Sequence, residues 1–92
     1  MPVSLRPAAQ DDLLAIVAYI AEDNPVAAYD VDAEIHRQIA ILNVQPNIGR
    51  KGRVKGTKEL VFQGLPYIAP YRVNGIDVEI LRVLHSSQAW PV

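Results

Sequence analysis

The chain contains no cysteine, and only two histidines and one tryptophan. Without cysteine it can form neither a disulfide framework nor a thiolate metal site, and two histidines are too few for a metal cage. No apolar run approaches the roughly eighteen residues that a membrane span needs, and the N-terminus shows no apolar export signal. We therefore expect a cytoplasmic protein with no metal, no other cofactor and no membrane partner.

Length and composition indicate a single globular domain. The 92 residues are enough for one hydrophobic core and too few for two. Half of them are hydrophobic and 21% are charged, which is the balance of a folded domain and not of a disordered chain. We expect one domain over residues 1–92.

Charge is unevenly distributed, although the formal net charge is only -1. Acidic residues dominate the first half of the chain and basic residues the second, so one end of the molecule is expected to attract an acidic or phosphate-bearing partner. The glycines among the basic residues predict a flexible loop that can approach a nucleic-acid backbone closely. The alternative is a solvated loop without a binding role. The cations of this loop are Arg50, Lys51, Arg53, Lys55 and Lys58.

Two segments with apolar residues at three- and four-residue steps predict two helices. The first runs from Pro7 to about Glu22. Asp11 and Asp12 lie towards its N-terminal end, where the positive end of the helix dipole stabilises negative charge. The second begins after Asn24, whose side chain can cap it, and ends before the proline at position 46. Because the connection is so short, the helices should form an antiparallel hairpin.

Segments rich in β-branched and aromatic residues predict four strands. A short one at Val3–Arg6 precedes the helices, and three at Glu59–Gln63, Tyr67–Val73 and Ile76–His85 follow them. The fold class expected from this order is α+β. It consists of a short N-terminal strand, an antiparallel two-helix hairpin and a three-stranded antiparallel meander, with the helices packed on one face of the sheet.

The dipeptide Asn74-Gly75 predicts a two-residue type I′ turn between the last two strands. In that register Tyr71 lies opposite Val78, and Tyr67 lies opposite Arg82. The proline at position 70 cannot donate a hydrogen bond to a neighbouring strand, so a bulge or a locally unpaired edge is expected beside it.

Three stretches of the sequence resemble the RelE/ParE superfamily of type II toxins: GRVKGTKELV, PYIAPYRVNG and VEILRVLHSSQAWP. The similarity covers nearly the whole chain and is most specific from Gly49 to Pro91. It implies the toxin component of a bacterial toxin–antitoxin pair, which arrests growth. A cognate antitoxin would neutralise it within a toxin–antitoxin hetero-oligomer.

Two mechanisms are known in this superfamily, and they require different residues. RelE-like members are ribosome-dependent mRNA endonucleases, called mRNA interferases, whereas ParE-like members inhibit DNA gyrase by binding. The RelE branch has an arginine after the aromatic residue of the third strand, where this chain has Ile68 after Tyr67. It also has an aromatic C-terminal extension, which this sequence, ending at Val92, lacks. The resemblance is therefore closer to the ParE branch, although the arginines that often follow the histidine there are Ser86 and Ser87 here.

Gyrase inhibition by binding is the leading interpretation, and a RelE-like mRNA interferase is the alternative. RNA cleavage needs a base and an acid near the phosphate, and in the last strand His85 is the one residue of a type ordinarily suited to that role. His85 and Arg82 would be catalytic only in a nuclease. Otherwise His85 would bond a backbone carbonyl at the sheet edge, and Arg82 would stack on the ring of Tyr67.

The sequence also predicts two binding surfaces, one for the target and one for the antitoxin. The target would meet the basic loop and Trp90, although a lone tryptophan commonly just covers the edge of a core. The antitoxin would dock a helix or a strand on an exposed apolar sheet face. The expected target-binding residues are Arg50, Lys51, Arg53, Lys55, Lys58 and Trp90, and the expected antitoxin-binding residues are Tyr67, Tyr71, Val78 and Ile80.

Overall fold

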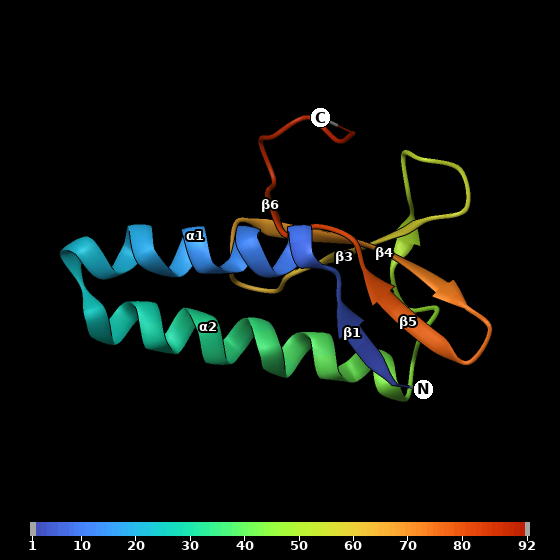
Figure 1. The fold of residues 1–92 in the computed structure, drawn as a ribbon, viewed down its shortest axis with the longest axis horizontal. Coiled ribbons are helices and arrows are strands. Elements are labelled where there is room, and N and C mark those ends of the chain that lie inside the picture. The colour runs from blue at the N-terminus through green and yellow to red at the C-terminus, as the bar shows by residue number, and fades with distance from the viewer. Residues whose placement is uncertain (1, 92) are drawn as a thin grey trace.

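The computed structural model describes residues 2–91 and shows a helical hairpin packed against a mixed sheet (Figure 1). This arrangement confirms the predicted α+β class. No helix among the described residues is long and apolar enough to cross a membrane. In chain order the elements are β1 (Val3–Leu5), α1 (Pro7–Asp23), α2 (Pro25–Ala40), the 3-10 turn η1 (Ile41–Asn43), β2 (Arg50–Lys51), β3 (Lys58–Val61), β4 (Tyr67–Asn74), β5 (Asp77–Ile80) and β6 (Leu84–His85).

The helix boundaries follow from local chemistry. Pro7 occupies the first turn of α1, where its missing N–H costs no hydrogen bond. Asn24 separates the two helices, and its side-chain Oδ1 accepts a hydrogen bond from the amide of Ala27 at 3.0 Å, which confirms the predicted cap. The second helix ends at Ala40, earlier than expected, because the chain tightens into η1 before it reaches Pro46.

The six strands form one sheet in the order β1-β5-β4-β3-β2, with β6 pairing the start of β4. β1 lies parallel to β5 at one edge, and Ser4 is opposite Glu79. The other neighbouring pairs are antiparallel. The sheet therefore joins the two ends of the chain.

The predicted register between β4 and β5 is wrong. Asn74 is the last paired residue of β4 and lies opposite Asp77, so Gly75 and Ile76 form the two-residue loop. A type I′ turn needs positive φ at both loop residues, but only Gly75 has one, at 64°. Tyr71 consequently lies opposite Ile80. The shift along β5 is two residues, so each side chain keeps its predicted face.

The bulge expected beside Pro70 is confirmed. Between the pairs on either side of it, β4 contributes Ala69 and Pro70, whereas the opposite chain contributes the three residues 81–83. The extra residue separates β5 from β6, and the amide of Leu81 donates to the Pro70 carbonyl at 2.8 Å. The bulge thus accommodates a proline inside a central strand.

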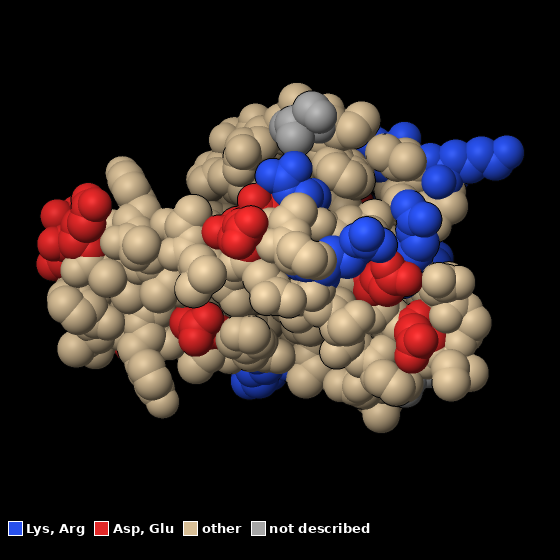
Figure 2. Space-filling view, viewed as in Figure 1, with Lys and Arg blue, Asp and Glu red and all other residues tan. Residues whose placement is uncertain are grey.

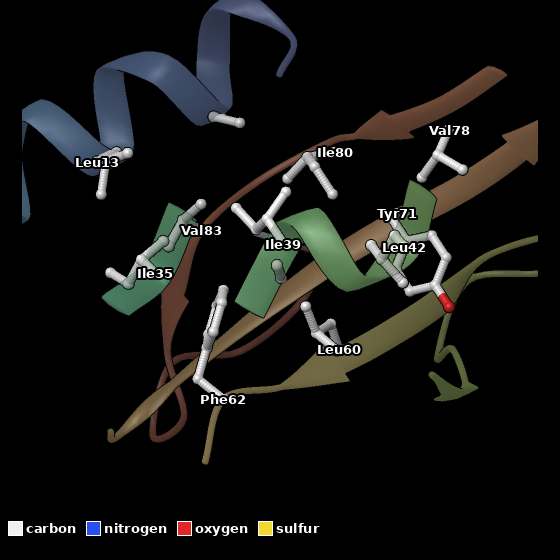
Figure 3. Packing of buried hydrophobic residues seen from close by; sticks show 12 residues of the cluster. Leu13, Ile35, Ile39, Leu42, Leu60, Phe62, Tyr71, Val78, Ile80 and Val83 are labelled. Atoms are coloured by element: carbon white, nitrogen blue, oxygen red, sulfur yellow. The ribbon is translucent and has the colours of Figure 1, made fainter. Parts of the chain in front are cut away.

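One face of the sheet carries the main core, which both helices cover (Figure 3). Ile35 and Ile39 of α2 lie in the same core cluster as Leu60 of β3 and Phe62, which directly follows β3. Tyr71 is fully buried, and its hydroxyl donates to the Pro46 carbonyl at 2.8 Å and accepts from the Gly49 amide at 2.9 Å. This phenol therefore fixes the chain that leads from the helices into β2.

The expected antitoxin face is corrected by this packing. Tyr71, Val78 and Ile80 are each 0% exposed, so they form no open apolar surface. Only Tyr67 of that group is partly accessible. The apolar side chains that alternate along β4 and β5 point to the face that the helices cover, because that burial is what stabilises the hairpin on the sheet.

Candidate functional site

The basic loop, defined here as residues 49–58, is organised around one buried carboxylate. Glu59 is only 1% exposed. Its Oε1 accepts hydrogen bonds from Nε and Nη2 of Arg50 at 3.1 and 2.9 Å. Its Oε2 accepts from the backbone amide of Arg53 at 3.1 Å, with Nε of Arg53 at 3.7 Å. One charge thus holds two arginines and the backbone of the loop.

Two glycines of this loop are required for packing, so the expectation of a mobile backbone is wrong at both. A Cβ at Gly52 would lie 2.1 Å from Oγ1 of Thr57 and 2.8 Å from its backbone carbon. A Cβ at Gly49 would lie 2.6 Å from the Tyr71 ring. Gly56 differs from both, because its φ of 81° lies in the region that favours glycine and open space surrounds it.

The C-terminal segment, defined here as residues 84–91, contains a histidine, His85, that is held by its neighbours. The ring of His85 lies edge-on to Tyr67, with centroids 5.8 Å apart. Its Nδ1 accepts a hydrogen bond from the backbone amide of Ser87 at 3.1 Å and lies 2.7 Å from Oγ of Ser87. The expected side-chain bond to a backbone carbonyl is not formed. A local turn takes its place, in which Gln88 accepts from the His85 amide at 2.7 Å.

Arg82 does not stack on Tyr67, which corrects that expectation. Its Nε and Nη2 donate to Asp12 of α1 at 2.6 and 3.0 Å. The same carboxylate accepts from the amide of Val83 at 3.0 Å. The Asp12 hydrogen bonds raise the pKa of Arg82 above its ordinary value. Arg82 is thus a structural contact that ties the bulge to α1.

Asp12 and Glu59 are the two residues of this region that sequence analysis missed. Asp12 was assigned to the dipole of its own helix, although it lies beyond the first turn and binds a residue 70 positions away. Glu59 was seen only as the start of a strand. Its one signal was its place beside five cations, and nothing in the pattern indicated burial.

The predicted target-binding residues gather at the sheet end of the molecule. In Figure 1 the loop after β2 and the C-terminal segment both rise from the side of the sheet away from α2. Figure 2 shows most of the basic atoms at this end, whereas the far tip of the helical hairpin shows only acidic ones. Trp90 is half-buried in the C-terminal segment, and its Nε1 has no hydrogen-bond partner among the described residues.

A separate apolar groove of about 330 Å³ lies over the helical hairpin. It is lined by Leu5, by Leu13, Leu14 and Val17 of α1, and by polar residues that include His36 of α2. Leu14 is 68% exposed, so a partner can reach it. Residues 2–91 contain no cluster of side chains that could hold a metal ion.

Comparison with known proteins places this geometry in a family. Residues 3–90 match the family described as the ParE toxin of the type II toxin–antitoxin system, parDE. A relative from Sinorhizobium fredii, named "Putative toxin Y4kP", is 50% identical over 76 residues, which are 83% of this chain and 78% of that protein. A solved structure titled "Chromosomal ParDE TA system from P. aeruginosa" superposes with a TM-score of 0.84 at 28% identity, over 92% of this chain and 95% of that one. The chain therefore belongs to the ParE toxin family, the toxin components of type II toxin–antitoxin systems.

Proposed function

We propose that this toxin arrests growth by binding DNA gyrase in the cytoplasm and not by cutting mRNA. The basic loop and Trp90 form the contact surface. The proposal rests mainly on the hydrogen bonding of His85. Family membership supports it, because ParE-like members of the superfamily act on gyrase without an evident catalytic site.

A neutral imidazole has one nitrogen that carries a proton and one that accepts. The Ser87 amide donates to Nδ1 of His85 at 3.1 Å, which favours the tautomer of the neutral ring that carries its proton on Nε2. In that tautomer Nε2 has no free lone pair to remove a proton from an RNA 2′-hydroxyl. Arg82, the candidate for stabilising the phosphate, is already bound by both oxygens of Asp12. These contacts support binding and disfavour RNA cleavage.

Two assays on the purified toxin test this proposal. We expect it to inhibit DNA supercoiling by gyrase and to leave mRNA intact on translating ribosomes. The variant His85→Ala should still inhibit gyrase, since the ring has no chemical role in that mechanism. Ribosome-dependent cleavage that disappears in His85→Ala would contradict the proposal and favour the mRNA interferase alternative.

We also propose that a cognate antitoxin neutralises this toxin by docking an apolar helix in the groove over the helical hairpin. The sheet face expected for this role is buried, whereas this groove is a largely apolar concave surface that stays open. Apolar grooves of this kind bind amphipathic helices through side chains at three- and four-residue steps. Leu14 and Val17, three residues apart on α1, supply the accessible part of the matching ridge.

A matched pair of variants tests the docking site. Leu14→Glu places a charge in the groove, whereas Ile76→Glu makes the same kind of change at an equally exposed residue, 76% accessible, in the β4–β5 turn. Titration with the protein encoded beside the toxin gene should show affinity at least about tenfold weaker for Leu14→Glu and unchanged for Ile76→Glu. Equal affinities in two folded variants would place the antitoxin elsewhere.

A further inference from the structure

The three lysines of this protein all lie in the basic loop, and none is within ion-pair distance of a carboxylate in residues 2–91. Five of the six arginines, by contrast, form an ion pair with a carboxylate. Apart from Arg72, the lysine charges are thus the ones left over once the internal pairs are made. The pairs are Arg6 with Glu79, Arg37 with Glu34, Arg50 and Arg53 with Glu59, and Arg82 with Asp12, while Arg72 lies opposite Glu79.

Two of these lysines are placed against each other. Lys51 of β2 lies directly opposite Lys58 of β3 in the antiparallel pair. The Cβ atoms of directly opposite residues are only about 5 Å apart, so like charges in that position destabilise the sheet. Both are on the rim of the sheet, and Lys55 extends the charge into the exposed loop between them. A bound polyanion would offset this repulsion.

The frame that carries the lysines is ordered by internal bonds. The Gly52 amide donates to the Thr57 carbonyl at 2.9 Å, and the Thr57 hydroxyl donates to the Val54 carbonyl at 2.6 Å. The Glu59 carboxylate accepts a hydrogen bond from the Arg53 amide, which fixes the backbone at that residue. Little backbone entropy would therefore be lost when a ligand binds the lysines.

The rest of the molecule would orient such a ligand. The tip of the helical hairpin carries exposed acidic residues, Glu22 and Asp23, at the opposite end from the loop (Figure 2). With a formal net charge of -1, the protein attracts polyanions only at its basic end and repels them elsewhere. A polyanion should therefore approach the molecule at the end that carries the lysines.

We propose that Lys51, Lys55 and Lys58 bind the phosphate backbone of duplex DNA, independently of sequence. Duplex DNA presents about one negative charge per 1.7 Å of its axis, and lysines bind phosphates as point charges. The loop has no aromatic side chain on which an unpaired base could stack, which argues against single strands. This inference rests on the proposed function, since gyrase works on duplex DNA and a toxin bound to the enzyme would meet that duplex.

Fluorescence anisotropy of a labelled mixed-sequence duplex, titrated with the full-length toxin alone, tests the proposal. Three phosphate contacts predict a slope of about -2.7 for log affinity against log salt, so tripling the salt should weaken binding about twentyfold. The triple variant Lys51→Gln/Lys55→Gln/Lys58→Gln should lose this binding. The control Arg37→Gln removes one positive charge on α2, away from the lysines, and it should keep the binding.

A thermal melt first confirms that the triple variant folds. If it does not, the single variant Lys55→Gln, at an exposed position, should make the slope shallower by about 0.9. A slope near zero, unchanged binding by a folded triple variant, or tighter binding of single-stranded DNA or RNA would overturn the proposal. Gyrase inhibition without duplex binding would refute this inference alone. Duplex binding without gyrase inhibition would refute only the proposed function.

Discussion

Removal of the Asp12 carboxylate should destabilise this protein more than any other single change at an acidic residue of α1. Asp12→Ala takes away both hydrogen bonds from Arg82 and the bond from the Val83 amide. The carboxylate side chain is 18% exposed and the arginine side chain 26%, so both groups are largely shielded from water. Breaking the pair leaves a guanidinium and a backbone amide without their partner.

The magnitude follows from these contacts. A hydrogen bond to a charged group contributes about 1.5–3 kcal/mol, and partial exposure reduces the sum for this cluster to about 2–3 kcal/mol. For a domain of this length the melting temperature should fall by about 10–20 °C. Asp12→Asn keeps one oxygen as an acceptor for the Val83 amide, so it should cost about half as much.

Urea denaturation and thermal melts measure this loss, and Asp11→Ala is the matched control. Asp11 is exposed and makes no hydrogen bond among the described residues, so its removal should change the free energy of unfolding by about 0.5 kcal/mol or less. A double-mutant cycle with Arg82→Ala should give a coupling energy of about 1–2 kcal/mol. Equal losses for the two aspartate variants, or a coupling near zero, would refute the assigned role of Asp12.

Three further changes test other contacts. Tyr71→Phe should lower the free energy of unfolding in urea by about 1–3 kcal/mol, because the Pro46 carbonyl and the Gly49 amide lose their partner; no loss would mean that water replaces the hydroxyl. Gly52→Ala should cost about 1–3 kcal/mol by the same assay, because the new Cβ meets the backbone of Thr57, and a neutral result would contradict the packing. Hydrogen bonds from Arg37 and Gln38 lower the pKa of Glu34 from 4.5 to about 2. Its contribution to stability is therefore complete above pH 4.5 and is lost as the pH falls towards 2, so Glu34→Gln should lose less stability than the wild type across that window, and parallel acid titrations would contradict this.

Local features of the fold could be read from the sequence because neighbouring residues decide them. The Asn24 cap, the first turn at Pro7 and the bulge beside Pro70 each follow from the backbone chemistry of one residue. Alternation also grouped the residues that share a face along β4 and β5, but beyond the bulge Tyr67 lies opposite His85 and not Arg82, so the predicted faces do not hold there. The predicted type I′ turn was wrong, because that turn requires positive φ at both loop residues and Ile76 does not adopt it.

Contacts between distant parts of the chain were decided by the tertiary structure. No local pattern shows that β1 pairs with β5, that Asp12 binds Arg82 or that Glu59 is buried beneath the basic loop. The sequence alone revealed where five cations gather, but only the folded chain shows that two of them are held by Glu59 and that the three lysines form no ion pair with a carboxylate of residues 2–91. The physical reason is that helix caps and turns depend on interactions within a few residues, whereas the partner of a charge and the side of a sheet that is covered depend on how the whole chain packs.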